Sequence, residues 1–401
     1  MAESGKKGFR TVTETDEEDF EQKLRKHRKK IVGRTIFIIL VLGVTVTGSW
    51  LYLSLRHYTE YDIISTVERE DSAATKYAEF QGNLLKYSND GATYADLSNE
   101  RIWTQAFELS NPQIDICGEY LTIYDKGGTM IYILSPAGLL GSVETTMPVA
   151  QVSIASQGTI GVLMQKDEAG YLAVYDRTGE ALAQGAIHGE KGGYPVAIAL
   201  SRDGIKLAVS MLDINDGTLK STVAFYNFGS VGQNMTDHCV GITTFPDMVI
   251  PEMEFVADDR MVAFSDTEIL IFEGMQKPQL TLELPFEQEI KSIFYNEGYV
   301  GIVYSNQDEA VTHHMQVYDT KGKLRMETDF SLEYDNVSFL SNGEICVQNE
   351  TACDLYTVGG VYRFHYEFEN ILYCVIPGKM GLNYSFVTDN VTSLSGFAAL
   401  P

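Results

Sequence analysis

Residues 150–186, AQVSIASQGTIGVLMQKDEAGYLAVYDRTGEALAQGA, contain four short apolar segments separated by turn residues. This pattern predicts strands over Ala150–Ser156, Thr159–Met164, Tyr171–Tyr175 and Ala181–Ala186. A turn at Asp176-Arg177-Thr178-Gly179 precedes the last of them. Four strands joined by short turns form one small antiparallel sheet, so the stretch predicts one structural unit of about 40 residues.

The third strand of this unit recurs along the chain together with its turn. The further copies are Tyr94–Asn99, Ile131–Gly138, Val223–Gly229, Ile269–Gly274, Gln316–Gly322 and Asp354–Gly360. The aligned positions Ala95, Leu134, Tyr175, Tyr226, Phe272, Tyr318 and Tyr356 are 38–51 residues apart, with a mean of 43.5. That spacing is the length of a four-stranded propeller blade. Immunoglobulin-like sandwiches need units of about 100 residues, and a parallel β-helix needs much shorter coils.

The last unit is incomplete. Leu372–Phe397 supplies three strands, and Tyr61–Glu68 has the pattern of the missing fourth. A ring closed by both ends of the domain leaves no open sheet edge at its seam, which favours this pairing. We therefore predict an all-β fold, a β-propeller of eight blades with seven as the alternative.

Two segments resemble known propeller repeats. Residues 199–209, ALSRDGIKLAV, form a predicted hairpin that bends at Asp203-Gly204 and resembles the strand pair of WD40 and YVTN-type propellers. Ala95–Trp103 is similar to a quinoprotein-type repeat, although Asn99 stands where glycine is usual and Trp103 has no counterpart in the other units.

A membrane-spanning helix is predicted before the propeller. Thr35–Leu55, TIFIILVLGVTVTGSWLYLSL, is an uncharged run of 21 residues, which spans roughly 30 Å as a helix. A cleaved signal peptide would have a shorter apolar core and small residues at its end, where this run has Trp50 and Tyr52. We expect an uncleaved anchor with these two aromatic rings at the outer membrane boundary.

Charge predicts the orientation of this helix. Seven cations precede it: Lys23, Arg25, Lys26, Arg28, Lys29, Lys30 and Arg34. After it come only Arg56 and His57 before the acidic region begins. The positive-inside bias predicts a cytoplasmic tail at residues 1–34, a transmembrane helix at 35–55 and an extracytoplasmic propeller at 56–401. The bilayer is then one partner, because the basic run also favours anionic headgroups.

The region after the tail is strongly acidic. Residues 35–401 carry 20 Lys/Arg and 48 Asp/Glu, a net charge of −28. Such a surface repels phosphate backbones, so nucleic acid is not expected as a partner. The excess acid serves solubility or, alternatively, attracts divalent cations or a basic partner.

No catalytic motif is found. GxSxG, HExxH and Walker A patterns are absent from the sequence, and the adjacent His313 and His314 would point to opposite faces of a strand. We predict no catalytic residue, metal ligand or cofactor. The sequence leaves open whether Cys346 and Cys353 form a disulfide across a hairpin.

Taken end to end, the basic tail, the anchor and the degenerate propeller resemble a family of single-pass membrane proteins of Clostridia-type bacteria that has no established activity. The resemblance implies a topology and a bacterial host. From the topology we expect a binding or scaffolding module for an envelope protein or a cell-wall component, acting through long loops at 186–195, 212–221 and 230–245. The alternatives are a hydrolase or lyase with carboxylates converging in the central channel, and a transmembrane sensor.

Overall fold

The computed structural model describes residues 14–166, 169–188, 193–215, 217–286, 288–308, 311–378, 383–389 and 391–397. The chain divides into two compact units, Met1–Arg56 and His57–Pro401. We describe each unit separately.

The first unit contains the helix α1, Glu14–Leu55. Its segment Gln22–Ser49 is long and apolar enough to cross a membrane. The helix begins well before Thr35 because the preceding residues are mostly Glu, Lys, Arg and Gln, which favour helices, with acids in the first turn. The seven predicted topology cations, Lys23, Arg25, Lys26, Arg28, Lys29, Lys30 and Arg34, all lie on α1 with exposed side chains, as does Tyr52. The side chain of Trp50 lies outside the described residues.

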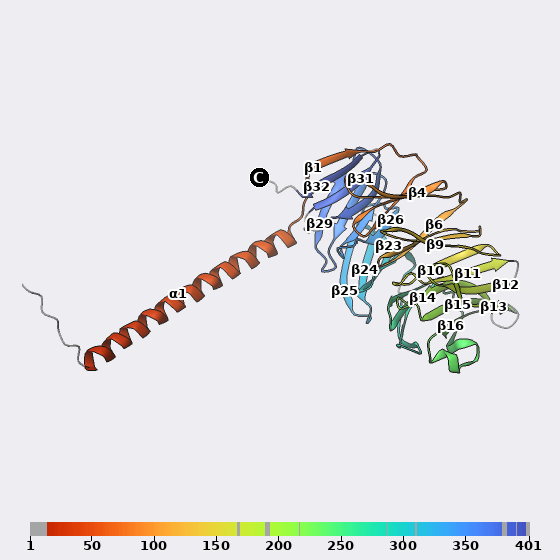
Figure 1. The fold of residues 1–401 in the computed structure, drawn as a ribbon, viewed down its shortest axis with the longest axis horizontal. Coiled ribbons are helices and arrows are strands. Elements are labelled where there is room, and N and C mark those ends of the chain that lie inside the picture. Colours follow the sequence, from red (N-terminus) through yellow and green to blue (C-terminus); the bar gives the residue numbers. More distant parts are fainter. Residues whose placement is uncertain are drawn as a thin grey trace, which may run out of the picture. The chain divides into compact units, whose positions relative to one another are not determined.

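The second unit is an eight-bladed propeller, because its described residues form eight four-stranded antiparallel sheets (Figure 1). Blade 1 consists of β2 (Lys76–Phe80), β3 (Asn83–Ser88), β4 (Gly91–Ala95) and β5 (Arg101–Ala106). Blade 2 consists of β6 (Pro112–Cys117), β7 (Tyr120–Asp125), β8 (Met130–Ser135) and β9 (Gly138–Glu144). Blade 3 consists of β10 (Val149–Ile154), β11 (Ile160–Lys166), β12 (Ala169–Tyr175) and β13 (Ala181–His188). Blade 4 consists of β14 (Tyr194–Leu200), β15 (Lys206–Asn215), β16 (Thr218–Asn227) and β17 (Cys239–Pro246), with the short 3-10 helices Gly232–Asn234 and Thr236–His238 before β17.

The remaining blades follow the same order. Blade 5 consists of β18 (Glu252–Ala257), β19 (Arg260–Phe264), β20 (Glu268–Glu273) and β21 (Gln279–Pro285). Blade 6 consists of β22 (Ile290–Tyr295), β23 (Tyr299–Asp308), β24 (Val311–Asp319) and β25 (Leu324–Phe330). Blade 7 consists of β26 (Asn336–Phe339), β27 (Ile345–Gln348), β28 (Ala352–Tyr356) and β29 (Tyr362–Glu367). Blade 8 combines β30 (Leu372–Pro377), β31 (Asn383–Thr388) and β32 (Val391–Phe397) with β1 (Tyr61–Glu68).

The predicted ring closure is confirmed. β1 pairs antiparallel with β32, from Tyr61 opposite Phe397 to Glu68 opposite Val391, and the two strands lie side by side in Figure 1. The predicted third strands are also confirmed as the third strands of blades 1 to 7. The seven-bladed alternative is therefore excluded.

Successive strands within a blade run in opposite directions, so the connections alternate between two ends of the propeller. We call the end with the first-to-second and third-to-fourth strand turns the turn face. The opposite end, with the second-to-third strand turns and the connections between blades, is the loop face. β1 is a fourth strand and begins at the turn face, where Tyr58 donates its backbone N–H to the Arg363 carbonyl at 2.7 Å. The chain thus enters the propeller at the turn face.

Apolar clusters fill the seams between neighbouring blades, and the seam between blades 8 and 1 has the smallest one, with Leu84, Ile376 and Val387 fully buried. A polar network supplements this seam. The Arg69 guanidinium, whose side chain is buried, lies 2.6 Å from the Asp71 carboxylate, and the Lys86 ammonium lies 3.0 Å from the same carboxylate. Ring closure therefore combines the β1–β32 pairing with a buried ion-pair network.

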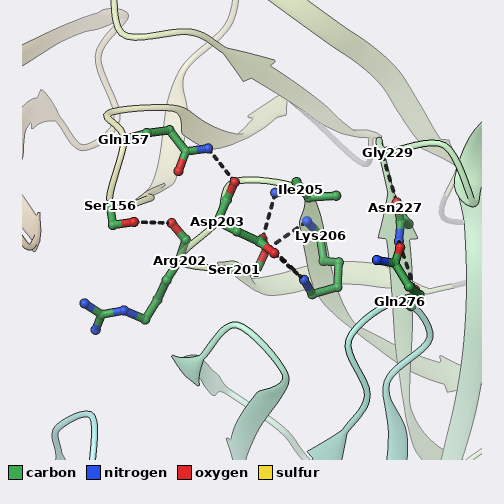
Figure 2. Close-up of polar contacts among 10 residues, drawn as sticks. All are labelled: Ser156, Gln157, Ser201, Arg202, Asp203, Ile205, Lys206, Asn227, Gly229 and Gln276. Atoms are coloured by element: carbon green, nitrogen blue, oxygen red, sulfur yellow. Dashed lines mark hydrogen bonds and ion pairs between the residues drawn. The ribbon is translucent and has the colours of Figure 1, made fainter.

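The turn at Asp203-Gly204, between β14 and β15 of blade 4, makes hydrogen bonds to blade 3 (Figure 2). Ser156 in the blade 3 turn donates its hydroxyl to the Arg202 carbonyl at 2.7 Å, and the Gln157 amide donates to the Asp203 carbonyl. The Asp203 carboxylate accepts a hydrogen bond from the fully buried Lys206 ammonium at 2.9 Å. Although partial burial acts to raise it, the hydrogen bonds from Ser201 and Lys206 hold the pKa of Asp203 below its ordinary value.

Cys346 and Cys353 do not form a disulfide, and both thiols are free and buried. Cys346 lies opposite Leu355 and Cys353 lies opposite Gln348, so the two cysteines are diagonal rather than directly facing neighbours. The remaining cysteines, Cys117, Cys239 and Cys374, are also free.

Candidate functional site: a central acidic cavity

The clearest candidate site is a cavity of about 480 Å³ lined by residues from blades 2 to 6. Because the first strand of each blade is innermost, residues of β6, β10, β14, β18 and β22 meet there. Lys126 directly follows β7, Pro251 directly precedes β18 and Val196 is near the start of β14, so these lining residues put the mouth of the cavity on the loop face. This is the end opposite to the point where the chain enters the propeller.

Three carboxylates from two blades line this cavity: Asp115 on β6, and Glu252 and Glu254 on β18. Both strands alternate apolar and polar residues, as Gln-Ile-Asp-Ile at 113–116 and Glu-Met-Glu-Phe at 252–255. Their apolar side chains pack into seams between blades, so the intervening acids remain directed at the centre.

Several side chains in the cavity accept hydrogen bonds from backbone N–H groups in the first strand of the next blade. The Asp115 carboxylate accepts the Ile154 backbone N–H at 2.8 Å, and the Ser153 hydroxyl accepts the Leu200 backbone N–H at 3.0 Å. Innermost strands have one unpaired edge, and these side chains satisfy its donors. Part of the polar lining is therefore structural.

Glu254 differs from these residues. Among the described residues, no hydrogen bond or ion pair is found for its carboxylate. Glu252, by contrast, accepts a hydrogen bond from the Tyr295 hydroxyl at 3.0 Å. A carboxylate that lines a cavity without a partner from the described residues is available to a ligand, which favours a functional role.

Burial and nearby charges change the pKa values of Glu254 and Asp115. Burial, together with the negative charges of Asp115 and Glu252, raises the pKa of Glu254 well above its ordinary range. Burial raises the pKa of Asp115 to about 6, against the opposing effect of the Ile154 and Ile116 backbone hydrogen bonds. A cation placed between them would favour ionisation of both.

The cation Arg202 lies near the turn-face end, in the turn between β14 and β15, and lowers the pKa of Glu254. Its guanidinium lies 2.6 Å from the Glu297 carboxylate of blade 6, and it points away from the Asp203–Lys206 pair (Figure 2). Within the described residues, no three His, Cys, Asp or Glu side chains are placed to hold one metal ion.

The sequence predicts carboxylates in the channel only for the alternative enzyme function, and it does not identify which acids these are. An acid between apolar residues of a first strand is the sequence feature that marks these carboxylates. Which first strands face one another, however, depends on how the blades close into a ring. Two of the three loops expected to bind are different in the structure. Residues 212–215 and 218–221 belong to the paired strands β15 and β16, with Asp213 opposite Lys220. Residues 230–238 connect the third strand β16 to the fourth strand β17 and so lie on the turn face, and residues 239–245 belong to β17. Of the third, 186–195, residues 189–192 lie outside the described residues.

Replacement of Glu254 by glutamine is expected to raise the melting temperature at pH 7.5, by on the order of 2 °C. A raised carboxyl pKa means that the folded protein retains a proton that the unfolded chain releases, so the wild type loses stability as pH rises between the two pKa values. The stabilisation by E254Q should therefore shrink towards zero at pH 4.5. Thermal unfolding at both pH values tests this, with the exposed Glu180→Gln as the control for loss of one charge. Equal effects of E254Q at the two pH values would contradict the assignment.

These features define an eight-bladed propeller with a polar cavity at its centre. The chain belongs to a family of unknown function (DUF5711), whose model matches residues 54–394. No curated protein matches the chain.

Solved propellers are similar in fold. Chaetomium thermophilum Sqt1 bound to the N-terminus of the ribosomal protein L10 is 14% identical, with a TM-score of 0.53, and the match covers 84% of this chain and 100% of that one. The computationally designed Ika8 protein is 12% identical, with a TM-score of 0.51, covering 84% and 99%. BamB from Moraxella catarrhalis is 13% identical, with a TM-score of 0.49, covering 84% and 100%.

Proposed function

We propose that this protein is a single-pass membrane protein whose extracytoplasmic propeller binds a protein of the cell envelope through the mouth of the central cavity. The supporting observation is the cavity itself, which opens on the loop face and contains an unpaired carboxylate. The apolar segment of α1 and the cations before it support an anchor with a cytoplasmic N-terminus. The Sqt1 complex supports the kind of partner, since that propeller of similar fold is bound to the N-terminus of another protein.

A thiol-directed crosslinker tests the side of the membrane and the contact together. Val196 lines the mouth and is 39% exposed, whereas Leu182 on the outer strand β13 is 60% exposed and lies outside this cavity. We expect the Val196→Cys variant, treated in intact cells with a membrane-impermeant maleimide–diazirine reagent and light, to yield one dominant adduct with an envelope protein. Leu182→Cys is the matched control, and the wild type gives the background from native cysteines.

Each outcome of this experiment is decisive. Labelling of Val196→Cys only after cells are permeabilised would reverse the proposed orientation. The same adduct from both positions would show that the mouth is not the contact. Labelling in intact cells without any protein adduct would contradict a protein partner and leave a cell-wall component as the ligand of a binding propeller.

A propeller hydrolase or lyase is a second candidate. The observation in its favour is that Asp115, with its pKa raised to about 6, shares a cavity with Glu254. Two carboxyl groups of this kind can act as general acid and general base near neutral pH. Turnover of a cell-wall fragment by the wild type that is lost in E254Q would favour catalysis over binding.

A further inference from the structure

The cavity has an apolar mouth and carboxylates further inside. Val196 and Pro251 line the mouth, whereas the side chains of Ile114, Val152 and Met253 pack into the seams between blades. Asp115 and Glu254 stand at interior positions of β6 and β18, whereas Pro251 precedes β18 at the loop face. A ligand that fits would have an apolar stem and a compact positive end.

We propose that the cavity binds the alkylammonium group of a lysine side chain, presented by a polypeptide partner at the loop face. This inference rests on the proposed function and specifies the chemistry of its site. The four-carbon stem of lysine would contact Val196 and Pro251 at the mouth while its ammonium reaches Glu254 and Asp115. The cavity volume of about 480 Å³ lies within the range of small-ligand pockets.

The geometry favours an ammonium over a guanidinium. The planar guanidinium of arginine pairs best with both oxygens of one carboxylate, in a fixed fork. Here the acids come from separate blades, and Asp115 already accepts backbone hydrogen bonds from Ile154 and Ile116. An ammonium has three donors that rotate freely, so it can bond acceptors arriving from several directions. Glu254, Asp115, and the hydroxyls of Ser153 and Tyr295 are such acceptors around this cavity.

Binding should be coupled to the release of protons. The charged and titratable groups around the site are Asp115, Cys117, Tyr124, Lys126, Arg202, Glu252, Glu254, Tyr295 and Glu297. Among them Asp115 and Glu254 have raised pKa values and hold protons that an incoming ammonium displaces. Affinity should therefore fall by roughly tenfold between pH 7.5 and pH 5.

The test uses the full chain in detergent micelles, titrated calorimetrically with the capped peptide GGKGG. The matched peptides replace lysine by norleucine, which keeps the stem without the charge, by acetyllysine, or by arginine. Pentane-1,5-diamine is included to separate a free amine from a lysine held in a polypeptide. We expect GGKGG to bind more tightly than all three matched peptides, and E254Q to lower its affinity at least roughly tenfold. Glu180→Gln, on the exposed surface, should leave it unchanged.

Equal binding of the lysine and norleucine peptides, or an unchanged affinity in E254Q, would overturn the proposal. Tighter binding of the diamine than of GGKGG would keep the alkylammonium site and replace the polypeptide by a free amine. An adduct at Val196→Cys without lysine binding would refute this inference alone, whereas lysine binding without an adduct would refute the envelope partner alone.

Discussion

Replacing Asp203 with alanine is expected to destabilise the propeller by about 3–5 kcal/mol, because it leaves a buried ammonium without its counter-charge. The Lys206 side chain is fully buried, and its ammonium contacts both carboxylate oxygens of Asp203, at 2.9 and 3.3 Å. The same carboxylate also accepts the Ile205 backbone N–H at 3.1 Å, which shapes the turn. Equilibrium denaturation followed by tyrosine and tryptophan fluorescence measures the loss.

Asp176 supplies the matched control. It occupies a similar turn in blade 3 and accepts backbone hydrogen bonds from Thr178 at 2.8 Å and Glu180 at 2.9 Å. Among the described residues no lysine is buried against it, so Asp176→Ala should cost much less than Asp203→Ala. Combining Asp203→Ala with Lys206→Met should recover much of the lost stability, because the unpaired charge is then removed. A cost of Asp203→Ala no larger than that of Asp176→Ala would contradict this account.

The propeller could be predicted from the sequence because its determinants are local. Alternating apolar and polar residues and turn glycines such as Gly204 and Gly343 can be recognised within each unit. Each pattern alone is weak evidence for strands, but its recurrence along the chain indicates a propeller. Gly204 has a φ of +66°, a left-handed conformation that glycine adopts without strain. Closure by Tyr61–Glu68 was also predictable, since the last unit lacked a strand and the first apolar alternating segment after the helix had no partner.

The cavity could not be predicted because its determinants are not local. Asp115 and Glu254 belong to blades 2 and 5, and nothing in either segment identifies the other as a neighbour. The buried ammonium of Lys206 was hidden for a similar reason. In sequence it is a charged residue after a turn, and only the tight Asp203-Gly204 bend folds it back onto the carboxylate three residues earlier.

Replacing Phe364 with alanine is expected to cost about 3–5 kcal/mol and to open the ring at its closing strands. Phe364 is fully buried at the seam between blades 7 and 8. Its ring centroid lies 4.6 Å from that of Phe397 on β32 and 5.7 Å from that of Phe386 on β31. The same residue bridges to Tyr58, just before β1. Loss of the Phe364 phenyl group removes packing from blade 8, which is the only blade assembled from both ends of the propeller.

Hydrogen exchange distinguishes this local opening from general destabilisation. In Phe364→Ala, the backbone amides of β1 and β32 should exchange faster than those of blades 2 to 6, because the closing strands become the least stable element. Phe272→Ala removes an equally buried ring from the seam between blades 4 and 5, where no chain end is involved. It should lower global stability by a similar amount while β1 stays as protected as its neighbours. If both variants accelerate exchange in β1 to the same degree, then the aromatic cluster around Phe364 does not hold the ring closed, and the β1–β32 pairing must depend mainly on the Arg69–Asp71–Lys86 network.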